Sequence, residues 1–210
     1  MIDAGSEIPK IGFVGAGSMG EPMVERLLAA GWPVTVYARK ADVRERLTAR
    51  GAEAAGSIAE AVGDAPVVVL CPFSSDQLEA IALGSDGVLA HAPDGAAVVV
   101  HTTTSPAVLR CLADAAEREI EIIDAPVSGT ADAIRAGALA VVLGGSVAGT
   151  ERIEAVLRSY ANSTVRVGEL GDAALVKLLN NSIFAAHVQI AQSAVSSAQA
   201  AGVDPETFVS

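Results

Sequence analysis

The chain has 210 residues, of which 51% are apolar and 19% are charged, and this composition excludes a disordered or collagen-like protein. The length suits one large domain, or one domain with a further segment. Fourteen Lys and Arg residues stand against 25 Asp and Glu residues, and the net charge of −11 would repel nucleic acid and anionic membranes, neither of which we expect as a partner.

Short apolar runs alternate with longer amphipathic stretches along most of the chain. Seven runs have the length and composition of strands, at 11–14, 34–37, 67–70, 97–101, 121–124, 139–143 and 164–167. Helical spacing lies between them, at 19–30, 42–50, 57–62, 76–82 and 106–118. Because this alternation is typical of βαβ units, we predict an α/β fold of the Rossmann type, with a doubly wound parallel sheet.

The six residues that follow the first strand, GAGSMG at 15–20, satisfy the pattern G-x-G-x-x-G. They connect an apolar strand to a helix, and this context favours a dinucleotide-binding turn over an ordinary glycine-rich turn. The N–H groups that begin the helix can bind phosphate. We therefore predict that a dinucleotide contacts Gly15, Gly17, Ser18, Met19 and Gly20.

The second strand leads into Ala38-Arg39-Lys40, where this kind of fold places the residue that reads the adenosine ribose. An acidic residue there pairs with a ribose hydroxyl, whereas two cations suit a 2′-phosphate. Arg39 and Lys40 therefore favour NADP over NAD, and a pair of solvated charges is the alternative. We interpret Asp42 as the N-cap of the next helix. We also expect Pro72, which follows the strand 67–70, to contact the cofactor.

Two further segments stand at the ends of predicted strands, where ligands bind in this fold. In the first, HTTTSP at 101–106, Thr104 or Ser105 can cap the following helix, while Thr103 can face the nicotinamide ribose or a substrate. In the second, DAPVSGT at 124–130, backbone N–H groups and the Ser128 hydroxyl can hold a carboxylate. An ordinary Pro-Ser-Gly turn is the alternative there.

Residues 172–201 contain neither Gly nor Pro and predict one long helix. Its single lysine, Lys177, lies among apolar residues, and Asn181 follows one turn later on the same face. The two side chains can point at one small site, and a snorkelling surface lysine is the alternative. A helix stop at Gly202 precedes a new helix start. We expect a dinucleotide-binding domain at 1–168, then the long helix and the start of an all-helical domain at 169–210.

These motifs together resemble the 3-hydroxyisobutyrate dehydrogenase family, the β-hydroxyacid dehydrogenases. The resemblance covers nearly the whole chain in order, through IGFVGAGSMGEPM, TTTSP, DAPVSGT and GELGDAALVKLLNN. It implies a Rossmann-type domain, a helical domain that packs between subunits, and hydride transfer between a nicotinamide dinucleotide and a small β-hydroxyacid or its semialdehyde. We therefore expect a homodimer or a higher homo-oligomer.

The resemblance also implies a role for each candidate residue. Lys177 would be the catalytic acid/base, and Asn181 would help to position the substrate. Ser128 and Gly129 would bind the substrate carboxylate, and Thr103 would lie beside the nicotinamide. An alcohol that donates hydride to a nicotinamide must also lose its hydroxyl proton, which a lysine can accept.

Two departures from the family pattern concern the substrate pocket. Thr130 and Ala173 stand where the family usually has glycine, and we expect the Thr130 side chain to narrow the carboxylate pocket. The alternatives to a dehydrogenase are an imine reductase and a non-catalytic dinucleotide-binding or oligomerisation module. Lys177 argues against both, because such relatives would be expected to lack it.

The two cysteines, Cys71 and Cys111, lie forty residues apart without a CxxC motif. They predict neither a disulfide scaffold nor a metal cluster, and they favour a reducing compartment. The N-terminal sequence MIDAGSEIPK contains no apolar stretch, and no run approaches the roughly 18 apolar residues of a membrane span. We predict a cytoplasmic protein, and we interpret the three histidines as structural.

Overall fold

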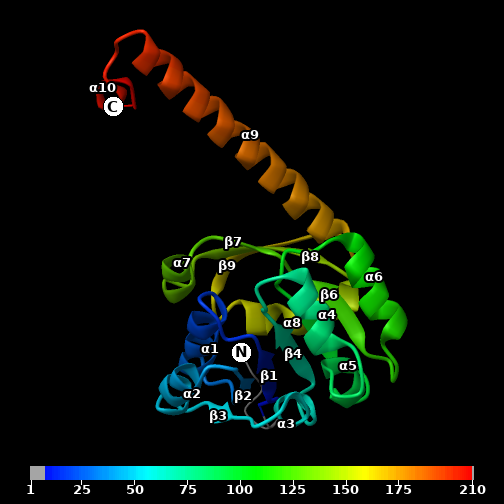
Figure 1. The fold of residues 1–210 in the computed structure, drawn as a ribbon. Coiled ribbons are helices and arrows are strands. Elements are labelled where there is room, and N and C mark those ends of the chain that lie inside the picture. Colours follow the sequence, from blue (N-terminus) through cyan, green and yellow to red (C-terminus); the bar gives the residue numbers. More distant parts are fainter. Residues whose placement is uncertain (1–7, 210) are drawn as a thin grey trace. The chain divides into compact units, whose positions relative to one another are not determined.

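The computed structural model describes residues 8–209, and the chain divides into two compact units, one that ends at Leu175 and one that begins at Val176. The first unit is a mixed sheet flanked by helices (Figure 1). Its strands within the described residues are β1 Ile11–Val14, β2 Val34–Tyr37, β3 Glu53–Ala54, β4 Val67–Leu70, β5 Ala97–Val100, β6 Glu121–Asp124, β7 Val127–Ser128, β8 Leu139–Gly144 and β9 Ala161–Gly168.

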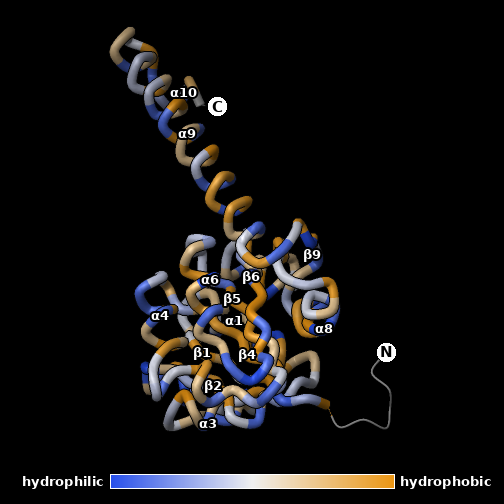
Figure 2. Tube along the Cα trace, turned by 90° about the vertical axis from the view of Figure 1, so that its right-hand side faces the viewer, coloured by the Kyte–Doolittle hydropathy of each residue, from blue (hydrophilic) through white to orange (hydrophobic). Residues whose placement is uncertain are grey.

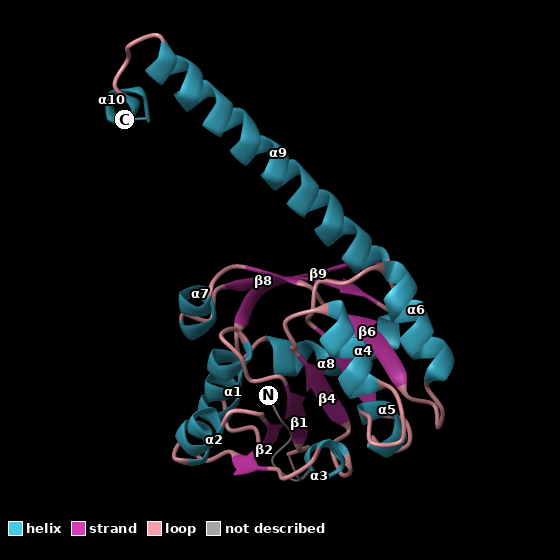
Figure 3. Cartoon of the chain, in the orientation of Figure 1, coloured by secondary structure: helices cyan, strands magenta, loops and turns pink. Residues whose placement is uncertain are grey.

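Helices follow most of these strands (Figure 3). They are α1 Gly20–Ala29, α2 Ala41–Thr48, α3 Ile58–Val62, α4 Ser75–Ala82, α5 Val88–His91, α6 Pro106–Ala115, α7 Ala131–Arg135, α8 Val147–Leu157, α9 Asp172–Ala200 and α10 Pro205–Val209.

The sheet has the strand order β3-β2-β1-β4-β5-β6-β8-β7, with β9 paired to β8. Strands β1 to β6 are parallel, and β1 lies between β2 and β4, so that Ile11 pairs with both Val34 and Val67. Strand β8 runs antiparallel to β6 and β7. The first six strands have the order of a doubly wound dinucleotide-binding fold, so the predicted fold class is confirmed.

Two hydrophobic cores cover the two faces of the sheet. Ile11 and Phe13 of β1 belong to the core that includes residues of α1, α2 and α8, whereas Val14 belongs to the core that includes residues of α3 to α6. Figure 2 shows the hydrophobic stretches along the central strands. Because both faces are buried, each central strand is a continuous apolar run, which made it recognisable in the sequence.

The structure corrects several local predictions. Helix α2 begins at Ala41 with Lys40 as its N-cap, so Asp42 is not the cap; it lies in the first turn and pairs with Arg46 at 2.9 Å. Helix α6 ends at Ala115 rather than near residue 118, where Arg118 and Glu119 adopt positive φ angles of 57° and 56°. The two-residue strands β3 and β7 and the helices α5 and α8 were not predicted.

The second unit contains most of α9, followed by α10 (Figure 3). The single long helix was predicted correctly. Gly202 has a φ of 82° after its end, and the Asp204 carboxylate accepts a hydrogen bond from the Thr207 N–H at 3.2 Å, as the helix-start motif predicted. Within the described residues, no helix is both long and apolar enough to cross a bilayer.

Candidate active site

A cleft of about 310 Å³ lies at the carboxyl ends of β1, β2 and β4. The strand order reverses at β1, which is the place where doubly wound folds bind their ligands. Five of the predicted cofactor residues line this cleft, namely Gly15, Gly17, Arg39, Lys40 and Pro72. The geometry therefore brings the glycine motif and the two cations to one site.

The three glycines of the motif have different physical roles. Gly15 has a φ of +103°, and a Cβ there would lie 2.6 Å from the carbonyl carbon of Cys71. A Cβ on Gly20 would collide with the Gly15 carbonyl oxygen and approach the Phe13 ring to 3.0 Å. A Cβ on Gly17 would meet no protein atom within 4 Å. The fold requires the first and third glycines, whereas Gly17 leaves open space, as a pyrophosphate site needs.

Helix α1 begins directly after this turn. Ser18 precedes its N-cap Met19, whose side chain makes no capping hydrogen bond to the first N–H groups of the helix. Glu21 in the first turn accepts two hydrogen bonds from the Arg46 guanidinium, at 2.6 and 2.9 Å, which lower the pKa of this carboxyl group. The guanidinium offsets the negative charge in the first turn, so the helix N-terminus keeps an environment suited to an anion.

A third cation, which the sequence analysis missed, supports the cationic edge of the cleft from α2. Arg39 and Lys40 are exposed, and no ion pair of either is found within residues 8–209. Arg44 of α2 donates hydrogen bonds to the carbonyl oxygens of Ala38, at 2.6 Å, and Arg39, at 3.1 Å. Arg44 therefore holds the backbone that presents the two exposed cations.

Other residues that line the cleft were also missed. They are Tyr37, which ends β2, and Cys71, Phe73, Gln77 and Ile81, which come from the segment after β4 and from α4. Phe73 is 93% exposed, and its N–H donates to the Gln77 side chain at 3.2 Å. Burial raises the pKa of the Cys71 thiol to about 12, which makes it a poor nucleophile. Their position after β2 and β4 was the available signal.

The hydroxyl-rich segment after β5 separates into structural and exposed residues. Ser105 accepts a hydrogen bond from the α6 backbone at 3.3 Å and is the cap of that helix. Thr104 is buried, and the Thr102 hydroxyl donates to the Pro72 carbonyl oxygen at 2.8 Å. Thr103 is exposed at the carboxyl end of β5.

A buried histidine braces the same edge of the sheet. His101 Nδ1 lies 2.6 Å from the Ala125 carbonyl oxygen, and Nε2 lies 2.9 Å from the Tyr160 hydroxyl oxygen. The carbonyl can only accept, so Nδ1 carries the proton and the tyrosine donates to Nε2. Desolvation lowers the pKa of His101 to about 4, and the ring is therefore neutral near pH 7. This histidine is structural, as expected.

The segment that contains Ser128 differs from the predicted turn. Val127 and Ser128 form β7, in which Ser128 pairs with Ala140 of β8. Gly129 follows with a φ of +140°, and a Cβ there would lie 2.9 Å from the Leu139 side chain. The Thr130 hydroxyl accepts the Ala133 N–H at 3.3 Å and caps α7, a role that the sequence analysis did not foresee.

Lys177 and Asn181 lie four residues apart on α9 and therefore share one helix face. Lys177 is half-buried, and desolvation lowers the pKa of its ammonium group from 10.5. Asn181 is exposed. Both belong to the second unit, whereas Thr103, Ser128 and Gly129 belong to the first, outside the lining of the dinucleotide cleft.

Comparison with known proteins agrees with this geometry. Residues 10–168 match the model of the NAD-binding domain of 6-phosphogluconate dehydrogenase. An NAD-dependent L-serine dehydrogenase of Pseudomonas aeruginosa is 34% identical over 177 residues, which are 84% of this chain and 59% of that protein.

Two solved structures have the same fold. Mycobacterium tuberculosis 3-hydroxyisobutyrate dehydrogenase with L-serine has a TM-score of 0.86 and 27% identity, over 94% of this chain and 67% of that one. An imine reductase from Myxococcus stipitatus with NADP+ has a TM-score of 0.82 and 26% identity, over 96% and 70%. The chain thus spans between 59% and 70% of the lengths of these proteins.

Proposed function

The chain belongs to the family of the NAD-binding domain of 6-phosphogluconate dehydrogenase, with β-hydroxyacid dehydrogenases among its homologues, and on this premise we propose that it transfers hydride between NADP(H) and a small β-hydroxyacid or its semialdehyde. The observation that carries the proposal is the half-buried Lys177, one turn from Asn181 on α9. We further propose that residues 1–168 form the dinucleotide-binding domain and that 169–210 begin a helical domain.

The cleft offers candidate partners for both the pyrophosphate and the 2′-phosphate of NADP. The open space at Gly17 and the uncapped N-terminus of α1 would hold the pyrophosphate. Arg39 and Lys40 would bind the 2′-phosphate of the adenosine ribose, and Arg44 would keep their backbone in place. NADP is therefore the proposed cofactor, and NAD, which lacks this phosphate, would leave both cations without an ionic partner. The bound nicotinamide would accept or donate the hydride.

Lys177 would move the proton that accompanies the hydride. During alcohol oxidation its neutral amine accepts the hydroxyl proton, and during carbonyl reduction its ammonium returns a proton. The lowered pKa of Lys177 increases the neutral fraction near pH 7, which suits the oxidation direction. Asn181 would orient the substrate on the same helix face. Ser128 and Gly129 would bind its carboxylate, and Thr103 would lie beside the nicotinamide.

An imine reductase is the second candidate, because one such enzyme has the same fold at a TM-score of 0.82. Reduction of an imine, like reduction of a semialdehyde, needs a proton donor such as Lys177, but an imine does not need a carboxylate-binding segment. The carboxylate-binding role proposed for Ser128 and Gly129 therefore favours a hydroxyacid.

The proposed assembly is a homo-oligomer. Helix α9 exposes the large apolar side chains of Leu179, Ile183, Phe184 and Ile190, which are 57–68% exposed. Apolar surface of this kind is covered in oligomers or by further chain.

Both Cys71 and Cys111 are free thiols, in keeping with the proposed location in the cytoplasm.

A substrate screen tests the proposed function. The full chain is incubated with NADP+ or NAD+ and small β-hydroxyacids, including 3-hydroxyisobutyrate and serine, and with NADPH and semialdehydes or cyclic imines. The nicotinamide absorbance reports turnover. We expect turnover of a hydroxyacid with NADP+ and none of the imines. Turnover of imines alone would support the second candidate, and binding of NADPH without any turnover would support a non-catalytic module.

A further inference from the structure

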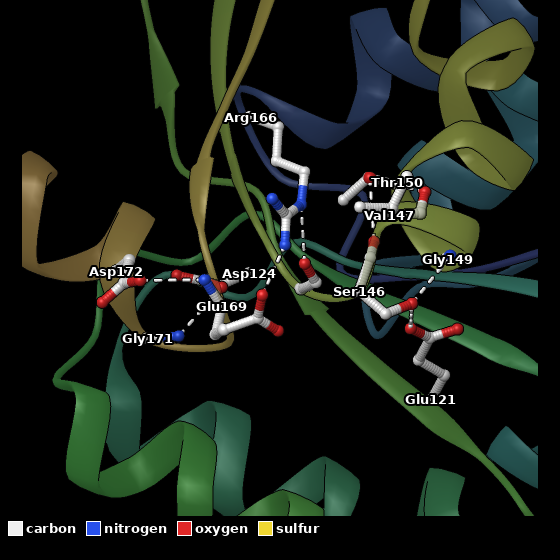
Figure 4. Close-up of polar contacts among 11 residues, drawn as sticks. Glu121, Asp124, Ser146, Val147, Gly149, Thr150, Arg166, Glu169, Gly171 and Asp172 are labelled. Carbon is white, nitrogen blue, oxygen red and sulfur yellow. Dashed lines mark hydrogen bonds and ion pairs between the residues drawn. The ribbon is translucent and has the colours of Figure 1, made fainter.

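The start of α9 is held by a carboxylate from another part of the fold. Asp124, the last residue of β6, is 1% exposed. Its Oδ1 accepts the Gly171 N–H at 3.1 Å, and its Oδ2 accepts the Ala174 N–H at 2.7 Å (Figure 4 shows Asp124 and Gly171). These donors lie 47 and 50 positions further along the chain. The β6 strand end and the first turn of α9 are therefore joined directly.

Asp124 supplies the cap that α9 lacks locally. Gly171, immediately before α9, has a φ of +99° and no side chain to accept a hydrogen bond. A helix begins with N–H groups that need acceptors, which the preceding Ser, Thr, Asp or Asn usually provides. Here the two carboxylate oxygens of Asp124, at the end of β6, are the acceptors for the Gly171 and Ala174 N–H groups.

The surrounding residues are arranged around this carboxylate. A Cβ on Gly144 would collide with Asp124 Oδ1, so glycine is required beside it. The connection from β9 to α9 is tied by Arg166, which donates to Glu169 at 2.6 Å and to the Gly145 carbonyl oxygen at 2.9 Å. The Glu169 N–H donates to Asp172 at 2.8 Å (Figure 4). The first turn of α9 is fixed from two sides.

Asp124 is close in sequence to one proposed active-site residue, and the helix start that it binds is close in sequence to another. Asp124 precedes Ser128 by four residues, and Ala174 precedes Lys177 by three residues within one continuous helix. Each residue of an α-helix is rotated by a fixed angle from the one before. The bond to Ala174 therefore fixes the rotation of the first turn, from which α9 continues to Lys177.

We propose that Asp124 is a positioning residue, which fixes the first turn of α9 and so orients Lys177 for proton transfer. This inference rests on the proposed function of Lys177. A carboxylate in this place is costly to bury, and desolvation raises the pKa of Asp124 while the two N–H bonds lower it. An amide would keep the shape of the side chain but would lose one of its two acceptor oxygens.

A double-mutant cycle tests the proposal in the full chain. The variants are Asp124→Asn, Lys177→Ala and the double variant, measured for kcat, KM and NADPH binding. We expect Asp124→Asn to lower kcat about 10- to 100-fold, with the NADPH Kd within threefold of wild type. In the Lys177→Ala background it should lower kcat less than twofold further, because Asp124 acts through Lys177.

Amide hydrogen exchange and a matched control separate positioning from stability. Exchange at Ala174 should accelerate at least tenfold in Asp124→Asn. Ser57→Ala also removes one backbone acceptor at a helix start, since the Glu60 N–H donates to Ser57 at 3.1 Å, and it should leave kcat within twofold. Asp124→Ser is the second variant if the amide variant does not fold.

Equal effects of Asp124→Asn in both backgrounds, or an unchanged kcat in wild type, would overturn the proposal. Failure of both Asp124 variants to bind NADPH would also overturn it, because Asp124 would then serve the whole fold. Activity that survives in Lys177→Ala would instead contradict the proposed function, and the two failures are thus distinguishable.

Discussion

Replacement of Gly17 by alanine should change stability and cofactor binding in opposite directions. Among the glycines that the structure describes, only Gly17 combines open space around a built Cβ with an ordinary, non-positive φ. The protein therefore has no conformational need for glycine there. A Gly→Ala change at such a position reduces the entropy of the unfolded chain and stabilises by about 0.4–1 kcal/mol. We expect the Tm of Gly17→Ala to rise by roughly 1–4 °C.

Dinucleotide binding should weaken in the same variant. The added methyl group occupies the space through which the pyrophosphate approaches the backbone and the start of α1. Loss of one charge-assisted hydrogen bond costs about 1.5–3 kcal/mol, which corresponds to a roughly 10- to 150-fold higher Kd.

The assay combines thermal unfolding without ligand and titration of NADPH fluorescence. Gly15→Ala is the matched control, because its Cβ would lie 2.6 Å from the Cys71 backbone at a φ of +103°. It should lower the Tm as well as weaken binding. An NADPH Kd within threefold of wild type in Gly17→Ala would refute the assignment of this turn to the pyrophosphate.

Three further outcomes follow from charges and burial. Arg39→Ala should raise the NADPH Kd about 10- to 100-fold and leave the NADH Kd nearly unchanged; equal losses in a titration of both cofactors would contradict the 2′-phosphate site. The pKa of His101 is lowered from 6.5 to about 4 in the folded state, so its contribution to stability is complete above pH 6.5 and is lost as the pH falls toward 4. That loss amounts to roughly 3 kcal/mol. In urea unfolding, the free energy of unfolding of the wild type should therefore fall more steeply with decreasing pH than that of His101→Asn. The rate of hydroxyacid oxidation should rise with pH through an inflection below 10.5, because desolvation lowers the pKa of Lys177; the same inflection in Lys177→Ala would exclude this lysine as its source.

The parts of the fold that were predictable are those with a local signal. Strands β1, β2, β4 and β6 begin and end at the predicted residues. Strands β1 and β4 are apolar runs buried on both faces, whereas β2 and β6 are largely buried and contain polar residues as well. Strand β7 has two residues and no detectable periodicity. Helix α8 contains Gly149 and the β-branched residues Val147 and Thr150, whose low helix propensity weakens its signal.

The candidate site divides in the same way. The glycine turn and the pair of cations after β2 are each a short run of neighbouring residues, so sequence patterns could locate them. Arg44 bonds to two backbone carbonyl groups. Every residue type has such a group, so no sequence pattern marks these contacts. Asp124 bonds to donors 47 and 50 residues away, and only the folded topology brings β6 to the start of α9.

The proposed reaction depends most on Lys177. The direct measurement is kcat of Lys177→Ala in the full chain on its best hydroxyacid, with the NADPH Kd determined in parallel. General acid–base catalysis is typically worth about 10²- to 10⁴-fold. We predict a loss of that size in kcat with an NADPH Kd within a few-fold of wild type. A variant that retains more than about a tenth of the wild-type kcat would contradict the role of Lys177.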